Sequence, residues 1–421
     1  MTLIKTSLLN AIAVIIKMAA MLGINKVLAI YVGPAGYAAI GQFQNAVQMI
    51  TTFASGAINT GVTKYTAEYG DEPDKQITVW RTASTISIMG ALVTSVLIAV
   101  FYQQIASLVF HSQEYASVFL WFATSLIFFV VNSLILAILN GKKEIIKFII
   151  INITGSLFSL VVIGLMVLKF QLYGALVGLV IYQSLNFFVI GFFVFKSEWF
   201  KFHYFFGRID KKVAKNLAKY AAMALTSAVC VPVSHILIRT HLGETLGWEA
   251  AGYWEAMWRL SGAYLMFVTT TLSVYYLPRL SELKTPQEIK NEILQGYKVI
   301  LPVAVACGLV IYLLRDFMIG VLFTTDFNPM RELFAWQMLG DTLKIGSWIL
   351  AYLMLGKAMI KLFIITEILF SASFYGLVVL FVNQYGIEGS VIAHAVNYAL
   401  YWVVMTVMIV ISFNKSYEAT F

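Results

Sequence analysis

The sequence predicts an all-α integral membrane protein with 12 transmembrane helices, arranged as two six-helix lobes that are parallel repeats of each other. The first observation behind this prediction is composition, because 60% of the residues are hydrophobic and 12% are charged, against roughly half and a quarter in soluble domains. The second is length, since 421 residues accommodate about a dozen spans of about 20 apolar residues each. The third is a set of motifs repeated between the two halves. A soluble globular enzyme is therefore excluded.

Apolar runs separated by polar breaks define the expected spans. The twelve predicted helices cover residues 8–32, 36–62, 80–110, 116–140, 146–169, 173–195, 216–239, 252–278, 298–322, 331–355, 361–383 and 389–413. We expect the first to be a retained helix and not a cleaved signal, because Lys17 interrupts its apolar run and no small-residue cleavage site ends it.

The 29 Lys and Arg residues predict how these helices are oriented. With the N-terminus in the cytoplasm, 21 of them fall in the inner loops, their flanks and the two terminal segments. Four fall in the outer loops, namely Lys169, Arg239, Arg315 and Arg331. The positive-inside rule therefore places both termini in the cytoplasm. The formal net charge of +8 thus reports topology, and no nucleic-acid partner is expected.

The two halves repeat each other at a nearly constant spacing, which predicts an internal repeat. Four pairs share it: Gly36 and Gly252, Lys64 and Arg279, Gly141 and Gly356, and Tyr173 and Tyr385, which are 216, 215, 215 and 212 residues apart. Six spans per copy return the chain to the same side, so the repeats are parallel. We expect lobes at 1–202 and 203–421. The linker at 196–215, rich in Trp, Phe and Lys, is expected to form a helix on the membrane surface.

Motifs for catalysis are absent from the sequence. It contains no glycine-rich phosphate loop followed by Lys and Ser or Thr, which excludes ATP hydrolysis by this chain. The five histidines show no i, i+4 pair typical of zinc sites, so we expect no metal and no cofactor. Cys230 and Cys307 lie in apolar runs and are expected in the core. The enzyme alternative is a membrane glycan polymerase, and the short outer loops near 240–251 and 323–330 argue against it.

Ionisable residues within the predicted spans are the candidate functional residues: Lys17, Lys26, Glu255, Arg259, Asp341, Lys344 and Glu367. A charge inside a bilayer costs roughly 2.5–3.5 kcal/mol on insertion scales, so each one indicates pairing or function. Glu255 and Arg259 are four residues apart and Asp341 and Lys344 are three apart, so each pair shares a helix face and can neutralise itself. A structural ion pair and a transport role both remain open for these two pairs.

Lys17 and Lys26 have no acid three or four residues away in the sequence. Nine residues at 100° each place them on opposite sides of a straight helix, so they line one cavity only if the helix bends. Lys26 is near the outer end and can reach the interface, whereas Lys17 is about 18 Å along the helix from Lys5 and too deep to do so. Glu367 is expected to face Lys17 or Lys344. Lys17 is therefore the leading single candidate.

The predicted interior is mildly positive, with four cations against three acids, and this favours an anionic passenger. Lysine binds phosphate as a point charge and arginine as a bidentate fork, so a phosphate-bearing substrate fits best. We assign Lys17, Lys26, Arg259 and Lys344 to substrate binding, and Glu255, Asp341 and Glu367 to ion coupling or charge pairing.

Several segments resemble a known family. They are YVGPAG at 31–36, GVTKYTAEY at 61–69, YLPRLSELK at 276–284, LLRDF at 313–317 and RELFAWQMLGDTLK at 331–344. These motifs, together with similarity over the whole chain, resemble the Wzx-type flippases of the multidrug/oligosaccharidyl-lipid/polysaccharide exporter superfamily. Lys17, Lys26, Asp341, Lys344 and Glu367 sit in contexts that resemble those of the family. Glu255 and Arg259 depart from the pattern that the resemblance implies, which is uncharged at these positions.

The resemblance implies a transporter of undecaprenyl-pyrophosphate-linked oligosaccharide in the bacterial inner membrane, which moves it from the cytoplasmic to the periplasmic leaflet. The departure at Glu255 and Arg259 leaves both an O-antigen unit and an enterobacterial common antigen unit open. The resemblance also implies the later glycan polymerase and chain-length regulator as partners. The alternative within the superfamily is a multidrug antiporter, and a cationic interior argues against it because cationic drugs require acidic sites.

Overall fold

The computed structural model describes residues 3–418 apart from Lys284 and Ala358. These residues form helices, turns and irregular segments without any strand. Lys284, which ends the motif YLPRLSELK and was expected among the inner-loop cations, lies outside the described residues.

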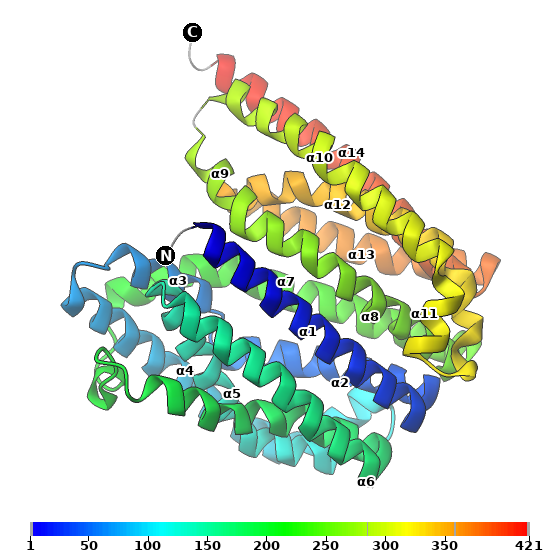
Figure 1. Ribbon diagram of the computed structural model, residues 1–421, viewed down its shortest axis with the longest axis horizontal. Coiled ribbons are helices and arrows are strands. Elements are labelled where there is room, and N and C mark those ends of the chain that lie inside the picture. The colour runs from blue at the N-terminus through cyan, green and yellow to red at the C-terminus, as the bar shows by residue number, and fades with distance from the viewer. Residues whose placement is uncertain (1–2, 284, 358, 419–421) are drawn as a thin grey trace. The chain divides into compact units, whose positions relative to one another are not determined.

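Fourteen α-helices make up the described chain (Figure 1). The first six are α1 (Leu3–Tyr31), α2 (Gly33–Ala54), α3 (Asn59–Glu68), α4 (Pro73–Phe110), α5 (Ser117–Gly141) and α6 (Ile145–Val194). The others are α7 (Lys211–Leu246), α8 (Trp248–Thr271), α9 (Leu277–Glu282), α10 (Pro286–Leu313), α11 (Arg315–Leu322), α12 (Phe334–Gly356), α13 (Ile360–Tyr385) and α14 (Glu388–Glu418). A π-helical turn, Leu272–Tyr276, joins α8 to α9.

The repeat predicted from the sequence pairs α5 with α12, and the two parts of α6 with α13 and α14. Helix α5 ends at Gly141 and α12 at Gly356, and a lysine follows each of them. Helix α6 has 50 residues, and Gln171 (φ 49°, ψ −127°) interrupts its helical geometry between the predicted spans 146–169 and 173–195. The connections after α2 and α8 differ, since Gly56 and Ala57 adopt positive φ after α2.

Nine of the helical stretches within the described residues are long and apolar enough to cross a membrane, so the chain is a multi-pass membrane protein. Each of the twelve predicted spans overlaps a helix or part of one. Helix α6, which contains two predicted spans, counts once among the nine, and α2 and α8 are not among them. The total of 12 spans and the cytoplasmic termini therefore stay predictions.

Two local expectations are wrong. The linker at 196–215 is not a surface helix, because it contains a single 3₁₀ turn, Phe202–Phe205, before α7 starts at Lys211. Cys307 is exposed on α10 and Cys230 is partly exposed, so neither is a fully buried core residue. Apolar character alone does not place a residue in a protein core when the outer surface of a span is also apolar.

The chain divides into two compact units. Unit 1 contains residues 1–32 and 39–232, and unit 2 contains residues 33–38 and 233–421. The core of unit 1 includes Trp80, Leu134 and Ile138. Within unit 2, α12 is the central helix and contacts α8, α10, α13 and α14 (Figure 1). The helical stretch Thr325–Gly356 contains α12, and 67% of the residues in its apolar 18-residue segment are buried. The corresponding share for α10 is 11%. Polar residues on α12 are therefore placed in the interior of unit 2.

Candidate functional site

The interior of unit 2 contains a carboxylate that four side chains contact. Asp341 of α12 is fully buried. Ser261 and Tyr264 of α8 donate hydrogen bonds to its Oδ2 at 2.5 and 2.6 Å. Gln337 donates to Oδ1 at 3.2 Å, and Nε2 of His394 on α14 lies 3.0 Å from the same oxygen. Contacts from three helices thus offset the cost of removing this carboxylate from water.

Gly340 makes room for the His394 ring beside Asp341. A Cβ atom at position 340 would lie 2.3 Å from Cδ2 and 3.0 Å from Nε2 of His394. Such contacts are too short, so a larger residue would push the imidazole away from α12. The tripeptide LGD therefore supplies both the carboxylate and the space that its histidine partner needs.

Lys344, one turn further along α12, is held by aromatic rings. Its side chain is buried, and Nζ lies 4.5 Å from the ring centre of Trp258 and 5.1 Å from those of Trp348 and Tyr398. Cation–π contacts of this kind are worth about 0.5–2 kcal/mol each. The ion pair expected between Asp341 and Lys344 is not formed, because other helices supply the partners of Asp341 and the lysine points into the rings.

A second ionic cluster contains one carboxylate and two guanidinium groups. Glu255 of α8 pairs with Arg259 at 2.8 Å, as the i, i+4 spacing predicts. Its other oxygen lies 3.0 Å from Nε of Arg239 on α7, whose side chain is 1% exposed. The Arg259 guanidinium also lies 5.4 Å from the ring centre of Tyr37. Because two cations share one acid, this cluster has an excess of positive charge.

Aromatic and imidazole rings connect the two clusters. Trp258 contacts His394 at 5.0 Å between ring centres and His235 at 4.5 Å. His235 in turn contacts Trp254 at 5.3 Å, and the Arg239 guanidinium lies 5.7 Å from the Trp254 ring. Helix α8 therefore carries residues of both ionic clusters and of the layer between them.

Several polar atoms around these clusters are buried without a hydrogen-bond partner in the described chain. They are Nδ1 of His394, Nε1 of Trp254, Nε1 of Trp258 and Oε1 of Gln337. A buried polar group left without a partner costs about 1–3 kcal/mol. Such groups are rare in native proteins and, when they cluster, indicate a place where function has been favoured over stability.

The predicted site residues are divided between the two units. Lys17 and Lys26 lie on α1 in unit 1, where Lys17 is exposed and Lys26 is partly buried. Glu367 of α13 is partly buried in unit 2. The structure therefore brings together Glu255 and Arg259 in one cluster, and places Asp341 and Lys344 in the other.

Sequence reasoning missed three members of the site. Arg239 was expected on an outer loop but is buried on α7, because this helix continues to Leu246, well past the predicted end at 239. His394 lies in the polar stretch AHAVN inside a span, a signal that was available. Tyr37 belongs to the Gly-Tyr pairs at 36–37 and 252–253, which served only as evidence for the predicted repeat.

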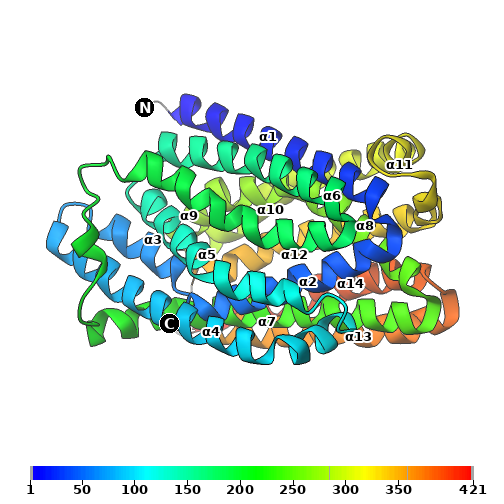
Figure 2. The same cartoon turned by 90° about the horizontal axis from the view of Figure 1, so that it is seen from below.

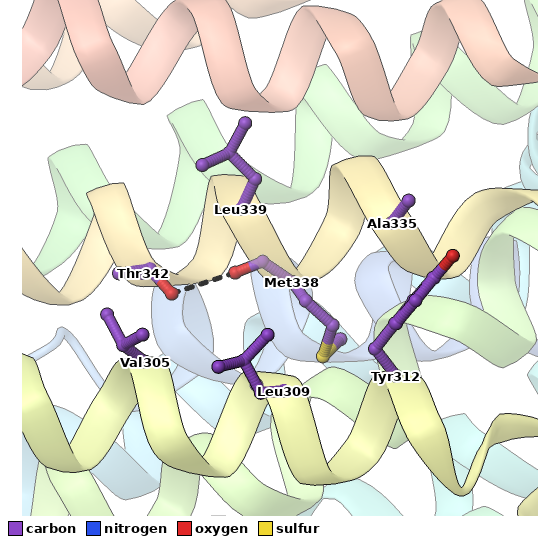
Figure 3. A pocket seen from close by; sticks show the side chains of 8 residues that line it. Val305, Leu309, Tyr312, Ala335, Met338, Leu339 and Thr342 are labelled. Carbon is purple, nitrogen blue, oxygen red and sulfur yellow. Dashed lines mark hydrogen bonds between the residues drawn. The ribbon is translucent and has the colours of Figure 1, made fainter.

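A groove between α10 and α12 is a separate feature of unit 2. It has a volume of about 320 Å³ and is lined by Val305, Gly308, Leu309, Tyr312, Ala335, Met338, Leu339 and Thr342 (Figure 3). The hydroxyl of Thr342 donates to the backbone oxygen of Met338 at 2.9 Å. No charged residue lines this groove, so it does not form part of the ionic site.

Known proteins resemble this chain in sequence. The family described as polysaccharide biosynthesis protein matches residues 3–284. A protein of Escherichia coli (strain K12) named lipid III flippase is 30% identical over 406 residues, which is 96% of this chain and 97% of that protein. The protein of the same name from Shigella flexneri matches to the same extent.

Solved structures resemble its fold. An inward-facing multidrug resistance MATE family transporter of the MOP superfamily has a TM-score of 0.78 at 13% identity, and 95% of this chain and 96% of that chain are covered. Its outward-facing counterpart has a TM-score of 0.67 at 16% identity, with 96% of each chain covered. A MOP superfamily transporter from Pyrococcus furiosus, described as having a binding pocket of reverse polarity, scores 0.62 at 13% identity over 94% and 95% of the two chains. At these identities the likeness concerns the fold alone.

Proposed function

This chain belongs to the polysaccharide biosynthesis protein family, and we propose that it is a flippase for lipid-linked oligosaccharides. The substrate is an undecaprenyl-pyrophosphate-linked repeat unit, which moves from the cytoplasmic to the periplasmic leaflet of the inner membrane. The relatives named lipid III flippase support this class of substrate. The chain is a transporter and not an enzyme in this proposal.

The observation that carries the proposal is the charge inside unit 2. Three cations, Arg239, Arg259 and Lys344, and two acids, Glu255 and Asp341, make up the two clusters. The buried groups balance each other, and the one excess positive charge comes from Arg259, whose side chain is 13% exposed. Partial burial of Arg259 makes this excess charge costly for stability, and an anionic passenger would compensate it. Guanidinium and ammonium groups are the usual partners of phosphate, so the pyrophosphate is the part of the substrate that this charge suits.

We assign substrate contact to Arg259 and Lys344 in unit 2 and to Lys17 and Lys26 on α1. Glu255, Asp341 and Glu367 are assigned to charge pairing or ion coupling. The two six-helix lobes alternate access to the substrate, as is typical of transporters built from repeats. The polyprenyl tail stays in the lipid while the head group crosses.

Two driving forces are compatible with this arrangement. An inside-negative membrane potential favours outward movement of an anion by about 2.3 kcal/mol per charge per 100 mV. Alternatively, a proton exchanges through Asp341 or Glu367 during each cycle. Asp341 is the better placed of the two, because His394 contacts it and both residues are fully buried. A dependence of flipping on the pH gradient at fixed potential distinguishes proton exchange from transport driven by potential alone.

The repeat unit is of the O-antigen or the common antigen type, and the polymerase and chain-length regulator that act later are the proposed partners.

A multidrug antiporter is the second candidate, because the MATE transporters share the fold. The excess of cations over acids in the two clusters argues against cationic drugs as substrates. Unchanged drug resistance after deletion of the gene would agree with this argument.

The test uses cells that lack their own flippase and a probe that detects lipid-linked units on one side of the membrane. We expect the wild-type chain to restore surface glycan. In the variants Lys344→Met and Arg259→Met, we expect at least about 90% of the lipid-linked unit to stay on the cytoplasmic side, which is a tenfold loss of flipping. Lys290→Met, on the exposed surface of α10, is the matched control and should be fully active.

Lys17→Ala and Lys17→Arg test the role assigned to α1. Anion binding by Lys17 predicts a loss in the alanine variant and partial recovery in the arginine variant at equal protein levels. Full rescue by Lys17→Ala would remove Lys17 from the site. Display of single repeat units on the outer side after deletion of the gene would instead indicate a polymerase and contradict the flippase proposal.

A further inference from the structure

The connection between α6 and α7 in unit 1 is an irregular segment, residues 195–210, that runs beside α4 (Figure 2). One side of this α6–α7 segment is docked on the core of unit 1. Trp80 of α4 contacts Trp199 at 5.5 Å and Phe205 at 6.2 Å between ring centres. The backbone nitrogen of Asp210 donates to Oγ1 of Thr82 at 3.1 Å. The segment is therefore fixed to the helices although it is not helical.

Gly207 explains how the segment lies so close to α4. Its φ of +150° is one that other residues rarely adopt, and a Cβ atom there would lie 2.5 Å from Cδ of Arg81. Thr85 donates a hydrogen bond to the carbonyl oxygen of Gly207 at 3.1 Å. Contacts at both ends and in the middle thus hold one defined conformation and leave the opposite side of the segment exposed.

The exposed side combines large apolar rings with basic residues. The apolar side chains are Phe195, Phe202, Phe206 and Ile209, which are 49, 68, 51 and 42% exposed. The basic ones are Lys196, Lys201 and Arg208, followed by Lys211, Lys212 and Lys215 at the start of α7, and all six are exposed. None of these six forms an ion pair with another described residue. Asp210, an acid of the same segment, already accepts a hydrogen bond from the backbone nitrogen of Val213 at 2.9 Å.

The apolar surface of this side continues that of a membrane span. Phe188 and Phe192 near the end of α6 are 65 and 67% exposed, and α6 is one of the stretches apolar enough to cross a membrane. The Lys196 ammonium lies 5.1 Å from the ring centre of Phe192. Cations thus begin where the lipid-facing phenylalanines end, which is the pattern of a surface at the level of lipid headgroups.

We propose that the α6–α7 segment is a binding surface for anionic phospholipid headgroups. Phe195, Phe202 and Phe206 enter the interfacial region of the bilayer, and Lys196, Lys201 and Arg208 contact the headgroup phosphates. Charge complementarity selects anionic lipid, because a basic cluster next to a span attracts acidic headgroups and gains little from zwitterionic ones. The positive-inside rule predicts that these lipids belong to the cytoplasmic leaflet. The surface is separate from the ionic clusters of unit 2 and does not depend on what the chain transports.

Native mass spectrometry of the full-length protein, titrated with phosphatidylglycerol or with phosphatidylcholine, tests the proposal. We expect preferential binding of phosphatidylglycerol, weakened at least about tenfold in the triple variant K196Q/K201Q/R208Q and also by added salt. The matched control K290Q/K298Q/K361Q removes three exposed lysines of unit 2 and should leave the affinity unchanged. These side chains are all exposed, so both variants should fold like the wild type, and thermal unfolding in detergent checks this.

A photoactivatable phosphatidylglycerol locates the bound lipid. We expect crosslinks within residues 195–210, with fewer in F202S/F206S. Equal weakening in the two triple variants would mean that surface charge of any origin attracts the lipid and would overturn the proposal. Crosslinks confined to other helices would overturn it as well. So would crosslinking of this segment to another protein in native membranes, without any crosslink to the photoactivatable phosphatidylglycerol.

Discussion

In unit 1 the buried polar side chains are amides and hydroxyls, whereas in unit 2 they include Arg239, Glu255, Asp341 and Lys344. Among the described side chains of unit 1, none that carries a formal charge is buried. Its amides connect helices instead, as where Nδ2 of Asn132 donates to the carbonyl oxygen of Gln183. The two units therefore have chemically different interiors.

The corresponding helices α5 and α12 illustrate the difference. In the predicted repeat, the spacing of 215 residues between Gly141 and Gly356 makes Leu126 of α5 the counterpart of Asp341 of α12, and both are fully buried. An apolar residue at this point is thus sufficient for a helix to pack. A buried charge lowers stability, whereas a buried leucine raises it. The buried charges of unit 2 are therefore best explained by function. Unit 1 shows that helices of this length pack without buried charges.

The largest effect is expected for Glu255→Gln. This change leaves the guanidinium groups of Arg239 and Arg259 without the carboxylate that they share, and loss of one partner from a buried ionic cluster costs about 3–5 kcal/mol. Asn132→Leu in unit 1 removes a neutral hydrogen bond and should cost only about 1 kcal/mol. Thermal unfolding of both variants in detergent measures the difference. Equal losses would mean that the two interiors are energetically alike.

A smaller effect is expected for Gly340→Ala. The added Cβ atom would contact the His394 ring at 2.3 Å, so we expect a destabilisation of about 1–3 kcal/mol together with loss of transport. Gly164→Ala on α6 of unit 1 is the control, because a Cβ atom there meets nothing within 4 Å. Alanine should stabilise that helix by about 0.5–1 kcal/mol. A wild-type unfolding temperature and normal transport for Gly340→Ala would contradict the tight fit of His394.

Lys344→Met should separate stability from function. Methionine fills a similar volume among the rings without a charge, so we expect unfolding to become more costly by about 1–2 kcal/mol while flipping is lost. Lys142→Met is the counterpart in unit 1, where the ammonium is partly buried and lies 5.5 Å from the Trp80 ring centre. It should leave transport unchanged. If Lys344→Met lowers the unfolding temperature, the charge at this position is structural.

The smallest effects are expected at the surface, where the two units should behave alike. Arg331 pairs with Asp316 at 2.5 Å and holds the pKa of this exposed carboxyl below its usual range. Because the folded-state pKa is lowered, the pair stabilises the protein above the unfolded-state pKa of aspartate and loses its effect as pH falls through the lowered value. Asp316→Asn should therefore change the unfolding temperature by less than about 1 °C at neutral pH.

Glu72→Gln breaks the exposed pair of Glu72 with Lys75 in unit 1. This change should also shift the unfolding temperature by less than about 1 °C at neutral pH. Differential scanning calorimetry at pH 7 and pH 3 compares the two variants with the wild type. A shift of several degrees for either one at neutral pH would show that these pairs matter more than their exposure predicts.

The sequence predicted local features of the fold well, because helices and i, i+4 contacts depend on nearby residues. The all-helical fold and the contact between Glu255 and Arg259 are examples. It predicted the partners of Asp341 poorly, because Ser261, Tyr264 and His394 are between 53 and 80 residues away in the chain. Hydropathy cannot show that a lysine points into three aromatic rings instead of toward the acid one turn before it.

Those three rings around Lys344 have an optical consequence. Two of them are the indoles of Trp258 and Trp348, whose absorption and emission depend on the electric field of charges nearby. Any event that moves or discharges the Lys344 ammonium changes that field, so the spectrum of these indoles changes with it. The protein thus contains a built-in fluorescent probe of its own interior, which can be followed in real time without a label.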